Sequence, residues 1–192
     1  GATPQGHAVK DDNATGYEWF TKEQDNTWYN DVDRHVEKGR ADQTAIIYDS
    51  AITGKKGTKS FAELQTQTAS LAGALRDQGI VSGDRVIIYM PMVPEALVAM
   101  LACARIGAVH SVVFGGFAAN ELAVRIDDAT PKAIIAASCG VEPGRVVAYK
   151  PLLDGAIDLA THKPHFTVIL QRNEGPCDLI AGRDHDWHDV QD

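Results

Sequence analysis

VIIYMPMVPEALVAMLACARIGAVHSVVF, residues 86–114, reads as a strand, a helix and a second strand in immediate succession. The run Val86–Met90 has no polar alternation, which is typical of a strand covered on both faces. Pro94 suits the first turn of a helix and Gly107 the position after its last turn, so a buried helix is predicted between them. A second buried strand is predicted over Val109–Phe114.

The same alternation of strands and helices continues on either side of this stretch. Ser60 and Glu63 have the spacing of a capping box, and Gly79 is placed to end the helix that they begin. The other predicted elements are a short helix over 28–38, a strand over 45–48, a hairpin-like turn over 53–57, helices over 120–129 and 151–160, and strands over 133–137 and 166–170. This order predicts an α/β fold with a mainly parallel sheet and helices on both faces.

The two ends of the chain carry weaker signals. Residues 1–27 are polar and irregular, so an extended arm is expected ahead of a single α/β subdomain over 28–192. From Arg172 onward the chain is again polar, and this tail is predicted to have no core of its own.

The composition is that of a globular protein. The 192 residues are 44% hydrophobic and 23% charged, and the formal net charge of −8 argues against a nucleic-acid-binding surface. Residues 96–119 are long enough to cross a membrane, but Arg105 and His110 interrupt them, so no membrane association is expected. The first sixteen residues lack the apolar run of a signal peptide. A cytoplasmic location is therefore expected, with the mitochondrial matrix as the alternative in a eukaryote.

The cysteines fit the same compartment. Their number is odd, their spacing is wide, and no two form a C-x-x-C pair, so they are predicted to be small core residues rather than disulfides or zinc ligands. They are Cys103, Cys139 and Cys177.

Two segments that follow predicted strands are candidates for ligand binding, because open parallel sheets bind ligands beyond the carboxyl ends of their strands. In Phe114-Gly115-Gly116-Phe117, two glycines allow close approach of the backbone to a ligand ahead of a helix N-terminus. Gly140-Val141-Glu142-Pro143-Gly144-Arg145 is interpreted as a loop with a flexible glycine, a rigid proline and one arginine, a side chain suited to phosphate. Purely conformational roles for both segments stay open at this point.

Three further groups of polar residues are interpreted as structural. His185 and His188, with the aspartates at 184 and 186, have the chemistry of metal ligands but are expected to be a solvated part of the tail. Asp127-Asp128 is predicted to be a surface pair at a helix end. His110, inside an apolar strand, is predicted to be a hydrogen-bonded core histidine. No metal site is predicted.

A longer run of residues resembles a known family. The segment around Tyr29-Asn30 and Val32-Asp33-Arg34-His35 resembles the opening of propionyl-CoA synthetases, and residues 89–117 are similar to that family throughout. Shorter matches lie at Arg125–Asp128, Glu142–Arg145 and His162–Pro164, and the resemblance covers about residues 17–190. The chain is therefore similar to the N-terminal part of AMP-forming acyl-CoA synthetases of the acetyl-/propionyl-CoA synthetase family, most of all to the propionyl branch.

The resemblance implies a ligase that joins a short-chain carboxylate, propionate or acetate, to coenzyme A. ATP and the acid would give acyl-AMP and pyrophosphate, and CoA would then displace AMP; the whole enzyme would use ATP with Mg²⁺. It also implies that Phe114, Gly115 and Gly116 lie on the CoA side, together with the loop Glu142, Pro143, Gly144 and Arg145. Arg145 would be the partner of the ribose 3′-phosphate, and no catalytic residue is expected within these 192 residues.

The sequence departs from the family pattern in several places. Acetyl-type members usually show Arg-Gly-Gly-Arg where this chain has Glu142–Arg145, which favours the propionyl branch, and Trp28 and Asp31 replace smaller residues. The family's phosphate loop, TSGTTGLPKG, does not occur in the 192 residues, so these residues alone are predicted to be inactive without the remaining part of the ligase. The alternative is a stand-alone CoA- or nucleotide-binding module; an NAD-dependent oxidoreductase is disfavoured because no G-x-G-x-x-G occurs.

Overall fold

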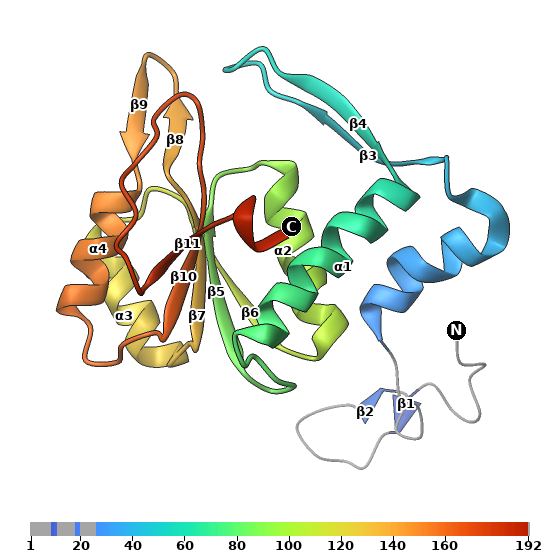
Figure 1. Ribbon diagram of the computed structural model, residues 1–192, viewed down its shortest axis with the longest axis horizontal. Helices are drawn as coiled ribbons and strands as arrows, with labels where there is room; N and C mark the ends of the chain where they lie inside the picture. The colour runs from blue at the N-terminus through green and yellow to red at the C-terminus, as the bar shows by residue number, and fades with distance from the viewer. Residues whose placement is uncertain (1–8, 11–17, 20–25, 192) are drawn as a thin grey trace.

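A five-stranded parallel sheet forms the centre of the fold (Figure 1). The structure, a computed structural model, describes residues 9–10, 18–19 and 26–191. The spatial order of the sheet is β11-β10-β7-β5-β6. The strands are β5 (Arg85–Met90), β6 (Val109–Phe114), β7 (Ala133–Ala137), β10 (Phe166–Leu170) and β11 (Asp184–Asp186). The polar arm expected over residues 1–27 lies largely outside the described residues; within it, β1 (Val9–Lys10) pairs antiparallel with β2 (Glu18–Trp19).

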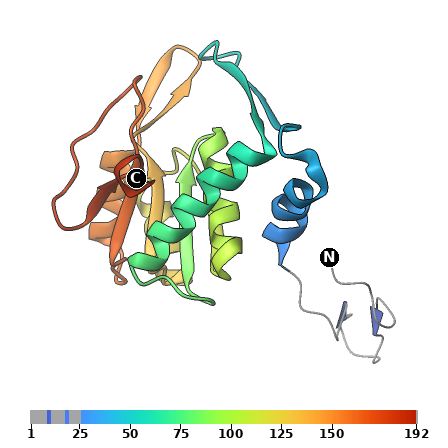
Figure 2. The ribbon, with the colours of Figure 1, turned by 45° about the vertical axis from the view of Figure 1, so that its right-hand side comes forward.

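Two pairs of helices cover the two faces of this sheet. Helix α1 (Phe61–Asp77) packs against α2 (Pro94–Ile106), and α3 (Ala119–Ala129) packs against α4 (Lys150–Leu159). Figures 1 and 2 show the first pair on one side of the strands and the second pair on the other. The predicted fold class, a mainly parallel sheet with helices on both faces, is confirmed.

The helix ends follow the signals in the sequence. The Ser60 side chain accepts a hydrogen bond from the Glu63 N–H at 3.2 Å, and the Glu63 carboxylate accepts one from the Ser60 N–H at 2.7 Å, which completes the capping box. Helix α2 ends at Gly107, whose φ of 75° lies in the left-handed region that glycine enters without strain.

The helix predicted over 28–38 is replaced by two short π-helical segments, η1 (Tyr29–Asp33) and η2 (Val36–Arg40). The left-handed φ of 76° at Gly39 interrupts the second segment just beyond the predicted range, which agrees with a helix that ends near Lys38. Beyond it, β3 (Thr44–Asp49) and β4 (Lys56–Ser60) form the expected antiparallel hairpin.

The two edges of the sheet contradict the sequence-based predictions. Strand β6 was expected to be buried, but Val109, Val112 and Phe114 are exposed, because β6 is an outer strand. The tail was predicted to have no core of its own, and it instead joins the main core: it supplies β11, a strand that was not predicted, which pairs parallel with β10, and the following Trp187 is buried in that core. A final turn of 3₁₀ helix, η3 (Asp189–Gln191), packs on α1.

Candidate functional site

The carboxyl ends of β5 and β7 form the switch point of the sheet. From β5 the chain crosses through α2 to β6 on one side, and it returns through α3 to β7 on the other side. Because α2, which follows β5, and α4, which follows β7, lie on opposite faces of the sheet, the segments after β5 and β7 diverge, and open parallel sheets bind ligands at such a point. The segments after β6 and β7 flank the end of β5, and they are the two candidates predicted from the sequence.

The first candidate, Phe114–Phe117, is a tight turn fastened by Tyr89 at the end of β5. The Tyr89 hydroxyl accepts a hydrogen bond from the Gly116 N–H at 3.2 Å and donates one to the Phe117 carbonyl at 2.9 Å. Burial raises the pKa of Tyr89 to about 12, so the hydroxyl keeps the proton that it donates. The Phe114 side chain is 72% exposed, and its ring lies 5.9 Å from that of Phe117.

The second candidate, interpreted from the sequence as a loop, is a β-hairpin. Strands β8 (Cys139–Glu142) and β9 (Arg145–Ala148) pair antiparallel, with Pro143-Gly144 at the tip. The φ of 79° at Gly144 is the value that the third position of a type II turn requires.

At this tip Arg145 is held by Glu142 rather than free. Arg145 Nη2 lies 2.6 Å and Nε 2.8 Å from Glu142 Oε2, while the Arg145 side chain is 69% exposed. An exposed pair of this kind adds little stability. It does fix one edge of the guanidinium and leaves the Nη1 edge directed away from the carboxylate.

One buried side chain packs between the turn and the hairpin, and it is not among the site residues predicted from the sequence. Tyr149, between β9 and α4, is buried, and its ring lies 5.2 Å from that of Tyr89. A methyl group added to Gly115 of the turn or to Gly140 of the hairpin would clash with its ring, so the ring packs against both segments. The only signal in the sequence is the presence of glycines at these places, and nothing in it shows that they share one neighbour.

Two segments distant in sequence support the hairpin from outside. The Arg172 guanidinium donates to the Cys139 carbonyl at 3.0 Å, and the Arg172 N–H donates to the Ser138 hydroxyl at 2.9 Å. Lys55, at the tip of the β3–β4 hairpin, lies 2.6 Å from Glu174. Figure 1 shows that both hairpins rise at the same end of the sheet.

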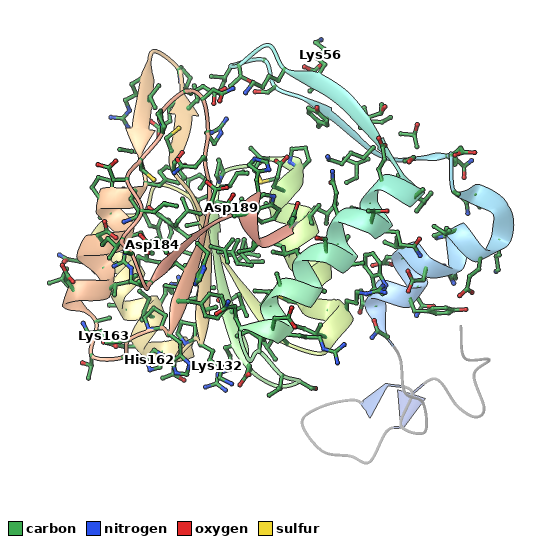
Figure 3. The ribbon with its side chains drawn as sticks, in the orientation of Figure 1. Lys56, Lys132, His162, Lys163, Asp184 and Asp189 are labelled. Atoms are coloured by element: carbon green, nitrogen blue, oxygen red, sulfur yellow. The ribbon has the colours of Figure 1, made fainter. Side chains whose placement is uncertain are left out.

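The opposite end carries a separate set of surface contacts. Figure 3 shows Lys132, His162 and Lys163 there, whereas Lys56 lies at the hairpin end. Asp127, exposed as predicted, accepts a hydrogen bond from the His162 N–H at 2.8 Å. These contacts hold helix ends together and lie far from the switch point.

The prediction of a solvated tail is wrong at Asp184, whereas His188 is exposed. Asp184 is buried, with Lys150 Nζ at 3.0 Å and Arg183 Nε at 2.6 Å. Within residues 26–191 no three His, Cys, Asp or Glu side chains are grouped so that they could hold a metal ion. His110 is only half-buried, because β6 is an edge strand, so its interpretation as a core histidine is wrong. Cys103 and Cys139 are buried as predicted, and Cys177 is partly so.

The turn and the hairpin each expose a group that is suited to ligand binding. The turn offers an exposed aromatic ring, and the hairpin offers an exposed guanidinium. A ligand with a ring system and an anionic group matches that pair of surfaces.

Comparisons with known proteins identify the family. A family model described as AMP-binding enzyme matches residues 32–187. The chain belongs to the AMP-binding enzyme family. It is 51% identical over 89% of its length to acyl-CoA synthetase short-chain family member 3, mitochondrial, of Rattus norvegicus. It is 46% identical over 91% to acetyl-coenzyme A synthetase of Deinococcus radiodurans, and 40% identical over 96% to propionate–CoA ligase of Escherichia coli.

The chain covers only part of these relatives, namely 25%, 27% and 29% of their lengths in that order. The sequence-based assignment to the acetyl-/propionyl-CoA synthetase group is confirmed at the level of the family. None of the helices among the described residues has the length and apolar character that crossing a membrane would need.

Proposed function

We propose that this chain forms the coenzyme A side of an AMP-forming acid–CoA ligase that acts on a short-chain carboxylate. In that reaction the carboxylate attacks the α-phosphate of ATP to give acyl-AMP and pyrophosphate. The CoA thiol then attacks the acyl carbonyl, and AMP leaves as the thioester forms. ATP with Mg²⁺ and the carboxylate are substrates of the complete ligase, in which residues 28–192 are the N-terminal α/β subdomain.

The observation that carries the proposal is the meeting of the turn and the hairpin at one end of the sheet. The turn Phe114–Phe117 and the hairpin that bears Glu142–Arg145 contact the same buried ring, that of Tyr149. Both follow strands that flank the switch point, where a parallel sheet receives ligands. The names of the three relatives supply the ligand class, because all three are ligases or synthetases of acyl-CoA.

We assign roles to the exposed groups from their chemistry. The Phe114 ring contacts the adenine or the pantetheine, and Gly115 and Gly116 allow the ligand to approach the backbone. Arg145 binds the ribose 3′-phosphate through its Nη1 edge, while Glu142 orients the guanidinium from the other side. Pro143 and Gly144 set the turn that presents Arg145. No catalytic residue is assigned within this chain.

The acyl substrate is propionate or acetate. The identities to the acetyl-coenzyme A synthetase and to the propionate–CoA ligase are 46% and 40%, so overall similarity does not favour propionate. The Glu-Pro-Gly-Arg tip, in place of the Arg-Gly-Gly-Arg usual in acetyl-type enzymes, supports the propionyl branch. Rates of the complete ligase with the two acids decide between them.

The central test is Arg145→Ala in the complete ligase. A charge-assisted hydrogen bond to phosphate is worth about 1.5–3 kcal/mol, so CoA binding should weaken roughly ten- to a hundredfold. Pyrophosphate exchange with propionate or acetate should stay nearly unchanged, since CoA does not take part in adenylation. The wild-type preference for CoA over dephospho-CoA, which lacks the 3′-phosphate, should disappear.

Arg125→Ala is the matched control, because Arg125 is an exposed arginine on α3 outside both segments. It should leave both half-reactions and the preference for CoA unchanged. If Arg145→Ala keeps the preference for CoA over dephospho-CoA, the assignment of Arg145 is wrong. The 192-residue chain alone should give no pyrophosphate exchange, and clear exchange by it would refute the view that it supplies only the coenzyme A side.

A further inference from the structure

Tyr149 fills the space between the Phe114–Phe117 turn and the base of the β8–β9 hairpin. Its side chain is buried. A methyl group added to Gly115 would lie 2.7 Å from the Tyr149 Cε2, 2.8 Å from its hydroxyl oxygen and 2.9 Å from the Met90 carbonyl oxygen. A methyl group added to Gly140 would collide with the same hydroxyl and lie 2.7 Å from Cε1. The two glycines therefore leave room for one ring, and that ring touches both segments.

Each segment is also fastened to its own strand, so the ring lies between two fixed pieces. On the hairpin side, the Tyr149 N–H donates to the Ser138 carbonyl at 2.9 Å, directly after β7. On the turn side, the Tyr89 hydroxyl holds Gly116 and Phe117, and the Tyr89 ring contacts that of Tyr149. A planar ring packed in this way is a spacer of fixed thickness.

We propose that Tyr149 is a positioning residue for coenzyme A, whose ring sets the separation between the turn and the hairpin. This inference rests on the proposed function, because it assumes that one ligand is held from both sides. Such a ligand requires its two contact surfaces to stay within about 0.5 Å of their productive spacing. Without the ring, the turn and the hairpin lose the shared contact that fixes the distance between Phe114 and Arg145.

The first experiment compares Tyr149→Ala with Tyr149→Phe in the complete ligase. Loss of the ring should raise the KM for CoA about ten- to a hundredfold, the size of effect expected for a misplacement of about 1 Å. The rate of pyrophosphate exchange with propionate and acetate should change less than about twofold, since adenylation precedes CoA binding. Tyr149→Phe keeps the ring and should restore a KM for CoA close to that of the wild type.

A double-mutant cycle with Gly140 tests the packing directly. Gly140→Ala alone should also raise the KM for CoA, because the new methyl displaces the ring. In the Tyr149→Ala background the same substitution should add nothing, because the three atoms closest to the new methyl all belong to Tyr149. Additive effects of the two substitutions would overturn the inference.

Arg145→Ala separates a failure of this inference from a failure of the proposed function. If Arg145→Ala does not remove the preference for CoA over dephospho-CoA, the proposed site is wrong whatever Tyr149 does. If Arg145→Ala behaves as expected, two results besides additivity in the cycle overturn the role of Tyr149 alone. One is an unchanged KM for CoA in Tyr149→Ala; the other is an equal loss of both half-reactions together with a lower melting temperature, which marks a purely structural residue.

Discussion

Strands β6 and β11 are the two edges of one parallel sheet, and each contradicts what its own residues favour. The sequence of β6, Val-His-Ser-Val-Val-Phe, is mainly apolar, yet Val109 and Val112 are 54% and 55% exposed. The sequence of β11, Asp-His-Asp, is polar, yet Asp184 is buried and Trp187 follows it into the core. Burial at an edge depends on the segments that cover it, and polar residues can be buried there when charges of opposite sign accompany them.

Four charged side chains form ion pairs where β11 packs against the rest of the fold. Lys150 and Asp154 come from α4, and Arg183 and Asp184 come from the tail and β11. Thr167 of β10 adds a hydrogen bond to Asp184 at 2.7 Å. The two positive and two negative charges balance, so the polar strand can lie against the sheet without leaving an unpaired charge.

The two edges should differ most in how much the free energy of unfolding falls when an aromatic side chain is removed. Trp187→Ala should lower the free energy of unfolding by about 3–5 kcal/mol, because Trp187 is only 3% exposed and its loss leaves a cavity. Phe114→Ala should change it by less than about 0.5 kcal/mol, because that ring is exposed at the other edge. Urea unfolding followed by circular dichroism measures both. Similar losses for the two variants would show that the edges do not differ in burial.

A smaller effect is expected from the charged group. Lys150→Met leaves two carboxylates facing Arg183 alone, and Lys150 is only 5% exposed. Removal of one partner from a buried pair costs about 3–5 kcal/mol, and the partial exposure of Asp154 reduces the expected loss to about 2–3 kcal/mol.

Lys56→Met is the matched control for that variant. It breaks the exposed pair between Lys56 and Asp49, which are 2.8 Å apart in the β3–β4 hairpin, and should cost less than about 1 kcal/mol. The same urea unfolding measures both lysine variants. Equal losses would mean that the group under β11 behaves as a surface network.

The next smaller effect is a loss of folding stability in acid, which should arise at the β11 edge. Burial alone would raise the pKa of Asp184, but hydrogen bonds from Arg183, the Ile180 N–H and Thr167 outweigh it, and the pKa lies well below its usual range. The stabilisation is therefore complete above the unfolded-state pKa of about 3.9 and is lost as the pH falls below it. Asp184→Asn should lower the melting temperature at pH 6 and should flatten its fall between pH 5 and pH 3. A fall as steep as that of the wild type would exclude Asp184 as a source of the acid sensitivity.

These two edges also show how far the sequence could predict the structure. Local signals predicted α1 through its capping box, α2 through Pro94 and Gly107, and the core strands β7 and β10 at their observed bounds. The pairing of β11 with β10 and the exposure of β6 depend on contacts between distant segments, which no local pattern contains. The candidate site divides in the same way. Its turn and its Arg145 tip could be found from glycine, proline and arginine, whereas Tyr149 could not, since its partners Gly115 and Gly140 are remote from each other in sequence.

The smallest expected effect concerns His110 on the β6 edge. Burial lowers its pKa below the usual value of about 6.5, so the unfolded chain takes up a proton at a higher pH than the folded chain does. Above pH 6.5 both states are neutral and His110 has no effect on stability; as the pH falls below 6.5 the folded state loses stability. The loss should be small, because His110 is only half-buried on an edge strand. His110→Gln, which cannot take up a proton, should remove this part of the fall in melting temperature between pH 7 and pH 5 and leave the acid response of Asp184 below pH 4 unchanged. If the variant and the wild type lose the same stability between pH 7 and pH 5, burial does not lower the pKa of His110 in the folded state. The β6 edge is then more open to solvent than its half-buried histidine indicates.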